Sequence, residues 1–151
     1  MLCCNVFNFV SYIFKMGRIL AIDYGKKRCG IAVTDPLQMI SNALDTIDTE
    51  NIEEYLLTYC RNEQVEKIIF GLPFHSDGKE TYLTQEVKDF SKILQQKLPE
   101  IKFDFQEESF TSVKAKEAIL QSGTPKMKRR DKGLVDRISA VIILQEYLGH
   151  Y

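Results

Sequence analysis

Three acidic residues stand at positions where a fold built only for stability seldom has a carboxylate. Asp23 ends an apolar run, Glu108 ends a strand-like segment, and Asp136 lies at the start of an apolar helix pattern over 134–148. An ionised carboxylate is costly to bury alone, so three of them on buried elements predict a shared partner. Because hard cations prefer oxygen ligands, the simplest partner is a divalent metal ion.

Each acid also has a structural interpretation when it is taken alone. Asp23 precedes a glycine-containing turn, where aspartate often accepts backbone hydrogen bonds. Strand side chains alternate, so only one of Glu107 and Glu108 points inward, and we predict that it is Glu108. Asp136, if it lies in the first turn of its helix, would only interact with the positive end of the helix dipole. The metal hypothesis therefore depends on the three acids lying together.

The helix pattern around Asp136 favours a position of this acid close to the other two. Ser139, Ala140 and Ile143 follow it at three, four and seven residues, so the acid shares a helical face with small and apolar side chains. Small residues let a helix approach a sheet closely. We therefore expect the last helix to bring Asp136 toward the strand ends that carry Asp23 and Glu108.

The apolar periodicity predicts a single α/β domain over 17–151, built on a mixed sheet. Strands 18–23 and 29–34, joined by a polar glycine-containing connection, form an antiparallel hairpin, and a weaker third strand follows at 43–47. Helices and strands then alternate, which predicts parallel βαβ units with helices on the sheet faces. Their expected ranges are helix 51–62, strand 67–70 ended by Gly71, helix 83–98, strand 101–107, helix 113–121 and helix 134–148.

Length, charge and cysteine usage limit the class of protein. With 151 residues, of which 44% are hydrophobic, the chain suits one domain with a real core. The net charge of −1 gives no global basic field, so any nucleic acid must be held by a local patch. The four cysteines, Cys3, Cys4, Cys29 and Cys60, show no metal-ligand spacing and indicate reduced thiols in a cytoplasmic protein.

Residues 1–16 are predicted to be a leader, disordered or upstream of the true start of translation. The segment is apolar and aromatic, but it has no basic residue ahead of its apolar stretch and no cleavage site, and it is too short to span a membrane. Met16 directly precedes the first strand and is the candidate start. The alternative is a short helix or strand that packs onto the domain.

Four sequence blocks, in the same order and spacing, resemble the YqgF family. They are Asp23, Tyr24 and Gly25 with 28–33, the segment 69–73 with Asp77 and Gly78, the segment 107–115, and the segment 132–136 with 139–144. The family is described as Holliday junction resolvases or nucleases that process the precursor of small-subunit ribosomal RNA, on an RNase H-like fold. The resemblance covers 17–148 and implies a five-stranded mixed sheet with three antiparallel strands first.

The resemblance also implies a two-metal phosphodiesterase site made by Asp23, Glu108 and Asp136. Two Mg²⁺ or Mn²⁺ ions about 4 Å apart would activate water and stabilise the leaving oxygen, so no side-chain nucleophile is needed. The partner would be precursor rRNA or branched DNA, with no nucleotide cofactor and no membrane. Candidate phosphate contacts are Lys26, Lys27, Arg28, Lys126, Lys128, Arg129, Arg130 and Lys132, although the second group would also suit a solvated loop.

Two positions depart from the family pattern, and two other functions stay open. Ser109 replaces an arginine that would contact phosphate, and His75 replaces an asparagine. His75 is either a proton carrier or, as for most lone loop histidines, part of a surface turn. Asp23 and Gly25 also resemble the phosphate loop of actin-like ATPases and sugar kinases, which need two such domains. A non-catalytic assembly factor would keep the same fold and acids.

Overall fold

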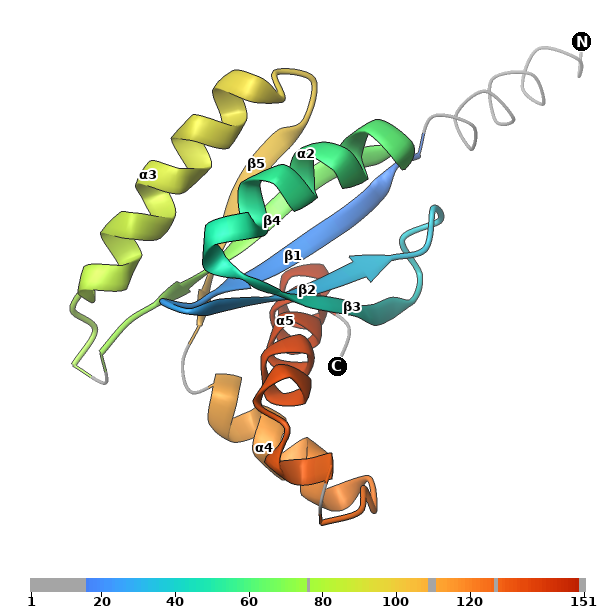
Figure 1. Cartoon of the computed structure of the whole chain (residues 1–151), viewed down its shortest axis with the longest axis vertical. Helices are drawn as coiled ribbons and strands as arrows, with labels where there is room; N and C mark the ends of the chain where they lie inside the picture. Colours follow the sequence, from blue (N-terminus) through green and yellow to red (C-terminus); the bar gives the residue numbers. More distant parts are fainter. Residues whose placement is uncertain (1–15, 76, 109–110, 127, 150–151) are drawn as a thin grey trace, which may run out of the picture.

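A five-stranded sheet with strand order β3-β2-β1-β4-β5 forms the centre of the structure (Figure 1). The computed structural model describes residues 16–75, 77–108, 111–126 and 128–149, so the predicted leader, apart from Met16, lies outside them. The strands are β1 (Arg18–Tyr24), β2 (Arg28–Thr34), β3 (Ser41–Asp48), β4 (Val65–Pro73) and β5 (Lys102–Glu108). The helices are η1 (Thr49–Asn51), α2 (Ile52–Asn62), α3 (Tyr82–Lys97), α4 (Thr111–Gln121), η2 (Lys128–Arg130) and α5 (Lys132–Leu148).

The strand directions follow the predicted pattern. β1 pairs antiparallel with β2, and β2 pairs antiparallel with β3. β4 pairs parallel with β1, with Ile22 opposite Phe70, and β5 pairs parallel with β4. The predicted mixed sheet, with three antiparallel strands followed by parallel units, is confirmed.

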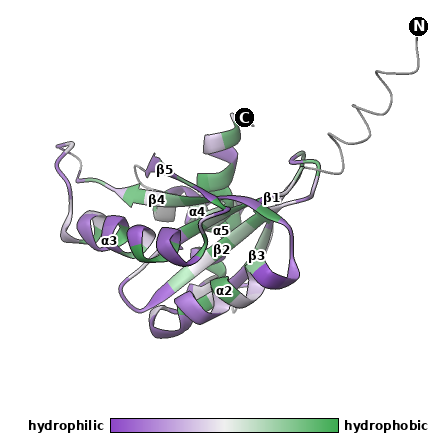
Figure 2. Ribbon diagram, turned by 90° about the horizontal axis from the view of Figure 1, so that it is seen from above, coloured by the Kyte–Doolittle hydropathy of each residue, from purple (hydrophilic) through white to green (hydrophobic). Residues whose placement is uncertain are grey.

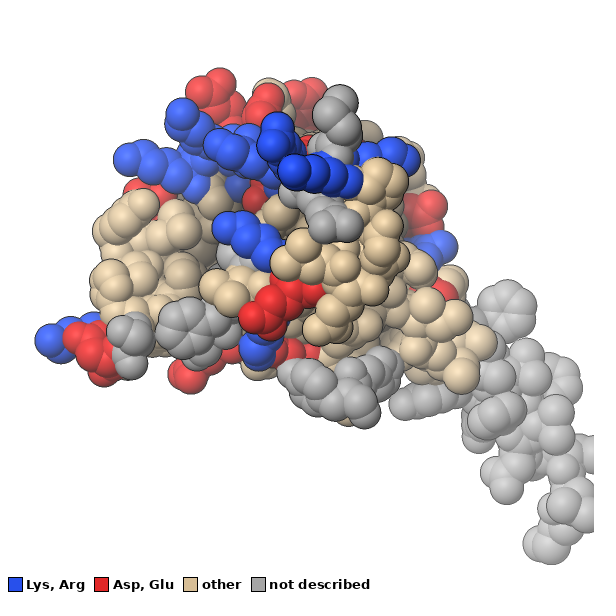
Figure 3. Space-filling model, turned by 90° about the horizontal axis from the view of Figure 1, so that it is seen from below, with Lys and Arg blue, Asp and Glu red and all other residues tan. Residues whose placement is uncertain are grey.

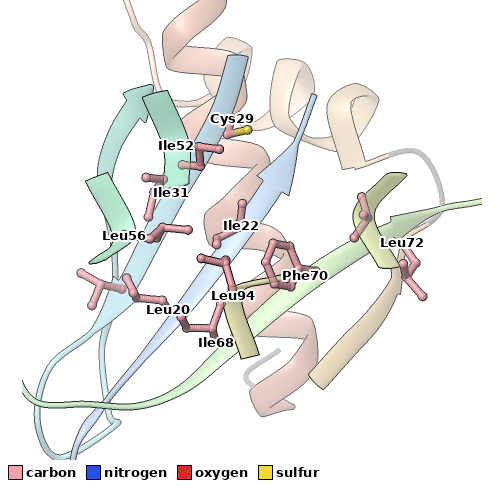
Figure 4. Close-up of a cluster of buried hydrophobic side chains, with 12 residues drawn as sticks. Leu20, Ile22, Cys29, Ile31, Ile52, Leu56, Ile68, Phe70, Leu72 and Leu94 are labelled. Carbon is pink, nitrogen blue, oxygen red and sulfur yellow. The ribbon is translucent and has the colours of Figure 1, made fainter. Parts of the chain in front are cut away.

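Side chains that alternate along β1 separate two apolar layers. Leu20 and Ile22 face α2 and α3, in a cluster that includes Phe70 (Figure 4). Ile19 and Ala21 face the opposite side, which α5 covers. Figure 2 shows apolar residues along the strands and along α5, and many polar residues along α2 and α3. Because the central strands are buried on both faces, their sequences are apolar runs rather than alternating ones.

The helices pack one apolar face onto the sheet. In α2, Ile52 and Leu56 are buried and Tyr59 is partly buried, as their spacing predicts. In α3, Val87 and Leu94 are buried in the same layer. None of the helices in the described part of the chain combines the length and the apolar character needed to span a membrane.

Most observed element boundaries lie one to three residues from the predicted ones, and two of the differences have a clear physical reason. β4 continues past Gly71, so the prediction that this glycine ends the strand is wrong. The backbone there is paired with β5, with Gly71 opposite Gln106, and this pairing outweighs the weak strand preference of glycine. α5 begins at Lys132, earlier than predicted, because Asp131 caps it by accepting a hydrogen bond from Gly133 N (2.9 Å).

Candidate active site

Asp23 lies at the carboxyl end of β1, on the face of the sheet that α5 covers. It is partly buried and pairs with Gly30 of β2. Ile19 and Ala21 of the same strand pack against α5, and the period of two along a strand gives Asp23 the same side. The position predicted for a metal ligand is therefore at a strand end and under a helix.

α5 brings Asp136 to the same place because it rests on a glycine. A Cβ atom on Gly30 would lie 1.9 Å from the backbone oxygen of Asp136, so no larger residue permits this approach. Gly30 is also the residue opposite Asp23. Ser139 and Ala140, one turn further along α5, are fully buried. The close approach predicted from the small residues of this helix is present, and it puts Asp23 and Asp136 on neighbouring segments.

Asp136 forms an ion pair with Arg28, at the start of β2. Arg28 Nε donates a hydrogen bond to Asp136 Oδ2 at 2.9 Å, and the two side chains are 37% and 25% exposed. Arg28 was predicted as a phosphate contact, and this partner 108 residues away has no local signal in the sequence. Because α5 begins at Lys132, Asp136 lies beyond the first turn, and the helix-dipole interpretation of this acid is wrong.

The buried thiol of Cys29 lies within the field of both acids. Burial is the main cause that raises its pKa to about 11, and the negative charges of Asp23 and Asp136 raise it further, against hydrogen bonds from Thr49 and Gly25. A thiol with this pKa stays protonated at neutral pH and is a poor nucleophile. Cys29 is therefore a core residue of the site, not a reacting group.

Glu108 ends β5, with its backbone in register with Pro73 of β4. The side chain of Glu108 lies outside the described residues, so the inward direction expected for it stays a prediction. Among the side chains that the structure describes, no three His, Cys, Asp or Glu residues gather closely enough to hold a metal ion. That set contains Asp23 and Asp136 but not Glu108. The carboxylate oxygens of the first two suit a hard divalent cation.

Basic residues precede and follow the acids in the chain and are exposed. Figure 3 shows Lys and Arg side chains gathered in a band on the face seen from below. The side chain of Arg129 lies outside the described residues. The exposed members of the predicted set are Lys26 and Lys27, in the β1–β2 turn, and Lys126, Lys128, Arg130 and Lys132, in the segment that leads into α5.

Thr46 fixes the start of α5 to the edge strand β3. Its hydroxyl donates a hydrogen bond to Gly133 O at 2.7 Å, and Arg137 Nη1 lies 3.5 Å from the same hydroxyl. Arg137 is also 3.7 Å from Asp131, the cap of the helix. This network holds the end of the basic segment beside the sheet. Sequence reasoning missed it because no local pattern links Thr46 to a glycine 87 residues away.

His75 lies in an exposed turn between β4 and α3. Its N–H donates to Lys79 O at 2.9 Å, and its carbonyl accepts a hydrogen bond from Gly78 N at 2.8 Å. These backbone contacts favour the surface-turn interpretation over that of a proton carrier. Ser109, the other departure from the family pattern, lies outside the described residues.

Comparison with known proteins identifies the family. A protein-family model described as "RuvX: Holliday junction resolvase" matches residues 17–150. The chain belongs to the RuvX family. This result confirms the resemblance to the YqgF family, which is the same family, and decides against an actin-like ATPase or a sugar kinase.

RuvX relatives match over almost their whole length. A protein of Porphyromonas gingivalis is 48% identical over 135 residues, which are 89% of this chain and 98% of the relative. A protein of Phocaeicola vulgatus is 48% identical over 133 residues, which are 88% of this chain and 96% of the relative. Both carry the name "Putative pre-16S rRNA nuclease".

A solved structure shares the fold of this RuvX chain. It is that of T. thermophilus RuvC in complex with a Holliday junction substrate, with a TM-score of 0.53 over 89% of this chain and 97% of that chain. Sequence identity is 14%, so the likeness concerns the fold alone. The predicted RNase H-like fold is confirmed.

Proposed function

We propose that this RuvX protein is a metal-dependent nuclease that hydrolyses phosphodiester bonds in the 5′-end processing of pre-16S rRNA, in the cytoplasm. The observation that carries the proposal is the approach of Asp136 to Gly30, the residue opposite Asp23, which puts two carboxylates at one strand end. Relatives matched over 96–98% of their own length carry the name of pre-16S rRNA nucleases. Metal-assisted hydrolysis also needs no nucleophilic side chain, and the protonated thiol of Cys29 supplies none.

Asp23, Glu108 and Asp136 would hold one or two Mg²⁺ or Mn²⁺ ions. Such ions, when bound, activate a water molecule and stabilise the leaving oxygen. Along β5, Asp104 faces α5, since it accepts a hydrogen bond from Tyr147 OH at 2.6 Å. The period of two along a strand predicts the same face for position 108, which supports Glu108 over its neighbour as the third ligand.

Arg28 would have two partners in turn. In the ion pair described above, its guanidinium compensates the charge of Asp136. A cation held by the same carboxylate would weaken this ion pair, because the cation and the guanidinium repel each other at short range. The guanidinium is then available to a substrate phosphate, as the sequence predicts. The ion pair would therefore keep Arg28 beside the site, where it can contact a substrate phosphate.

The decisive experiment compares cleavage by wild-type protein and two matched variants. A 5′-labelled pre-16S rRNA fragment is incubated with and without Mn²⁺. We expect wild type and Asp89→Asn, which alters an exposed acid on α3, to cleave it only with the metal, and Asp23→Asn to lose at least about 10²-fold in rate. Cleavage by Asp23→Asn at the wild-type rate would show that these acids are not the active site.

Resolution of Holliday junctions is the second candidate function. The family description names it, and the fold is shared with RuvC. A labelled four-way DNA junction, tested in the same assay, distinguishes the rRNA nuclease from the junction resolvase. Faster cleavage of the junction than of the RNA would favour the resolvase, and binding of both without cleavage would indicate a non-catalytic assembly factor.

The basic segment before α5 would hold the nucleic-acid backbone without reading sequence. Lys128→Ala combined with Arg130→Ala removes two exposed charges, so the slope of log affinity against log salt should fall by about 1.4 to 1.8. Arg61→Ala with Lys92→Ala, on α2 and α3, is the charge-matched control. Equal slopes for the two double variants would show that the segment is only a solvated loop.

A further inference from the structure

Tyr82 presents an exposed aromatic ring at the start of α3. The residue is 67% exposed, whereas the packing of α3 on the sheet is made by Val87 and Leu94. Lys26 Nζ lies over the ring of Tyr82, 5.9 Å from its centroid. The Tyr82 ring therefore has a cation beside it, and solvent surrounds most of its surface. The ring is not part of the hydrophobic core.

The backbone that carries Tyr82 is held firmly to the end of β4. Thr81 and Thr84 form a reciprocal capping box at the start of the helix. Thr84 is fully buried, and its hydroxyl donates a hydrogen bond to Pro73 O at 2.5 Å. The ring is thus presented by a fixed helix end, which lowers the entropy lost when a partner stacks on it.

Tyr82 lies at the end of the sheet where the acids are. Lys26, which contacts the ring, is three residues after Asp23, and Pro73, which anchors the helix, is opposite Glu108 in the sheet. In Figure 1 the first turn of α3 lies on one side of this sheet end, and α4 with the start of α5 lies on the other. A strand of nucleic acid that passes from the basic segment over the acids and then around this sheet end would reach Tyr82, because α3 lies on the opposite face of the sheet from α5.

We infer that Tyr82 is a stacking platform for an unpaired base next to the cleaved bond. The inference rests on the proposed nuclease function and names its substrate class, a single-stranded RNA or DNA segment. Proteins that bind single strands combine aromatic rings that stack on bases with cations that hold the backbone, and Tyr82 and Lys26 supply one of each. A base inside a duplex has both faces covered, so the ring selects an unpaired nucleotide.

A single tryptophan tests the stacking directly, because the chain has none. In Tyr82→Trp, a single-stranded RNA or DNA of about ten nucleotides should quench the indole emission, as base–aromatic stacking requires. An abasic strand of the same length should bind without quenching. Met39→Trp is the control, since Met39 is 69% exposed in the loop between β2 and β3, at the opposite end of the sheet.

Affinity without divalent cations, where no strand is cleaved, gives a second measurement. Tyr82→Ala should weaken binding of the single strand by about 5- to 150-fold, and Tyr82→Phe should not, because stacking needs only the ring. Duplex binding should be the same in both variants. The difference between RNA and DNA in the same titrations identifies which single strand is preferred.

The outcomes separate this inference from the proposed function. If Tyr82→Ala binds the single strand as tightly as wild type, or if the indole of Tyr82→Trp is not quenched, the ring is no platform, while metal-dependent cleavage by wild type would still support the nuclease. If wild type binds neither single strands nor duplexes and cleaves none, the nuclease proposal itself fails.

Discussion

Gly30→Ala tests the packing that places Asp136 beside Asp23. The new Cβ atom would lie 1.9 Å from Asp136 O and 3.0 Å from Arg137 N. Ordinary contact begins at 3.4 Å, so α5 would have to retreat by about 1.5 Å, the difference between 3.4 and 1.9 Å. The variant therefore perturbs both the packing of the helix and the position of the acid.

The expected loss is large because the obstructing atom belongs to a helix backbone and cannot rotate away. Overpacking costs about 1 to 3 kcal/mol, and the upper end applies where the backbone itself must move. For a domain of this size, about 3 kcal/mol lowers Tm by roughly 10 °C. A catalytic group misplaced by about 1 Å can also cost on the order of 10²-fold in rate.

Thermal melting measures the first effect, and initial rates of Mn²⁺-dependent cleavage, taken well below the melting range, measure the second. Gly133→Ala is the matched control, since the same methyl group at the start of α5 meets Asp131 Oδ1 at 3.2 Å, and this side chain can shift. Alanine also favours a helix by about 1 kcal/mol over glycine. We expect Gly133→Ala to melt within about 4 °C of wild type.

A Gly30→Ala protein that melts and cleaves as wild type does would refute the close packing of α5 on β2. A Gly30→Ala protein that is destabilised but cleaves at the full rate would show that catalysis does not depend on the present position of Asp136. Either result is measured in the same two assays.

Three further predictions concern other parts of the chain. Burial raises the pKa of the Cys29 thiol from 9.0 to about 11, so the folded state holds this proton more tightly, and the resulting stability is complete below pH 9 and is lost toward pH 11. The free energy of unfolding, measured by urea denaturation between pH 9 and pH 11, should therefore decline more steeply for wild type than for Cys29→Ala. Equal slopes would contradict the burial of the thiol. Thr46→Val removes the hydrogen bond to Gly133 O and should cost about 1 kcal/mol in the same assay, whereas no loss would mean that the contact does not form in solution. A chain that begins at Met16 should melt within about 2 °C of the full chain, and a larger loss would show that apolar residues of 1–15 pack on the domain.

The sequence alone determined the elements and the residue types of the site. Apolar runs and glycine-containing connections locate the β1–β2 hairpin and the later helices, because the periodicity of side chains along a strand or helix is a local property. Asp23 and Asp136 could be singled out for the same reason, since a carboxylate next to an apolar run is recognised from the local sequence alone. The small residues after Asp136 likewise predict a close approach of the helix.

Tertiary structure alone decided which residues meet. β4 runs past Gly71 because β5 continues to supply backbone partners there, and the pairing of Arg28 with Asp136 spans 108 residues. The contact of Lys26 with Tyr82 likewise joins the β1–β2 turn to the start of α3. Such contacts depend on strand register and on the approach of packed layers. Strand register and the approach of layers leave no periodic signal in the sequence. The contacts that depend on them therefore follow from the assembled fold and not from any single segment.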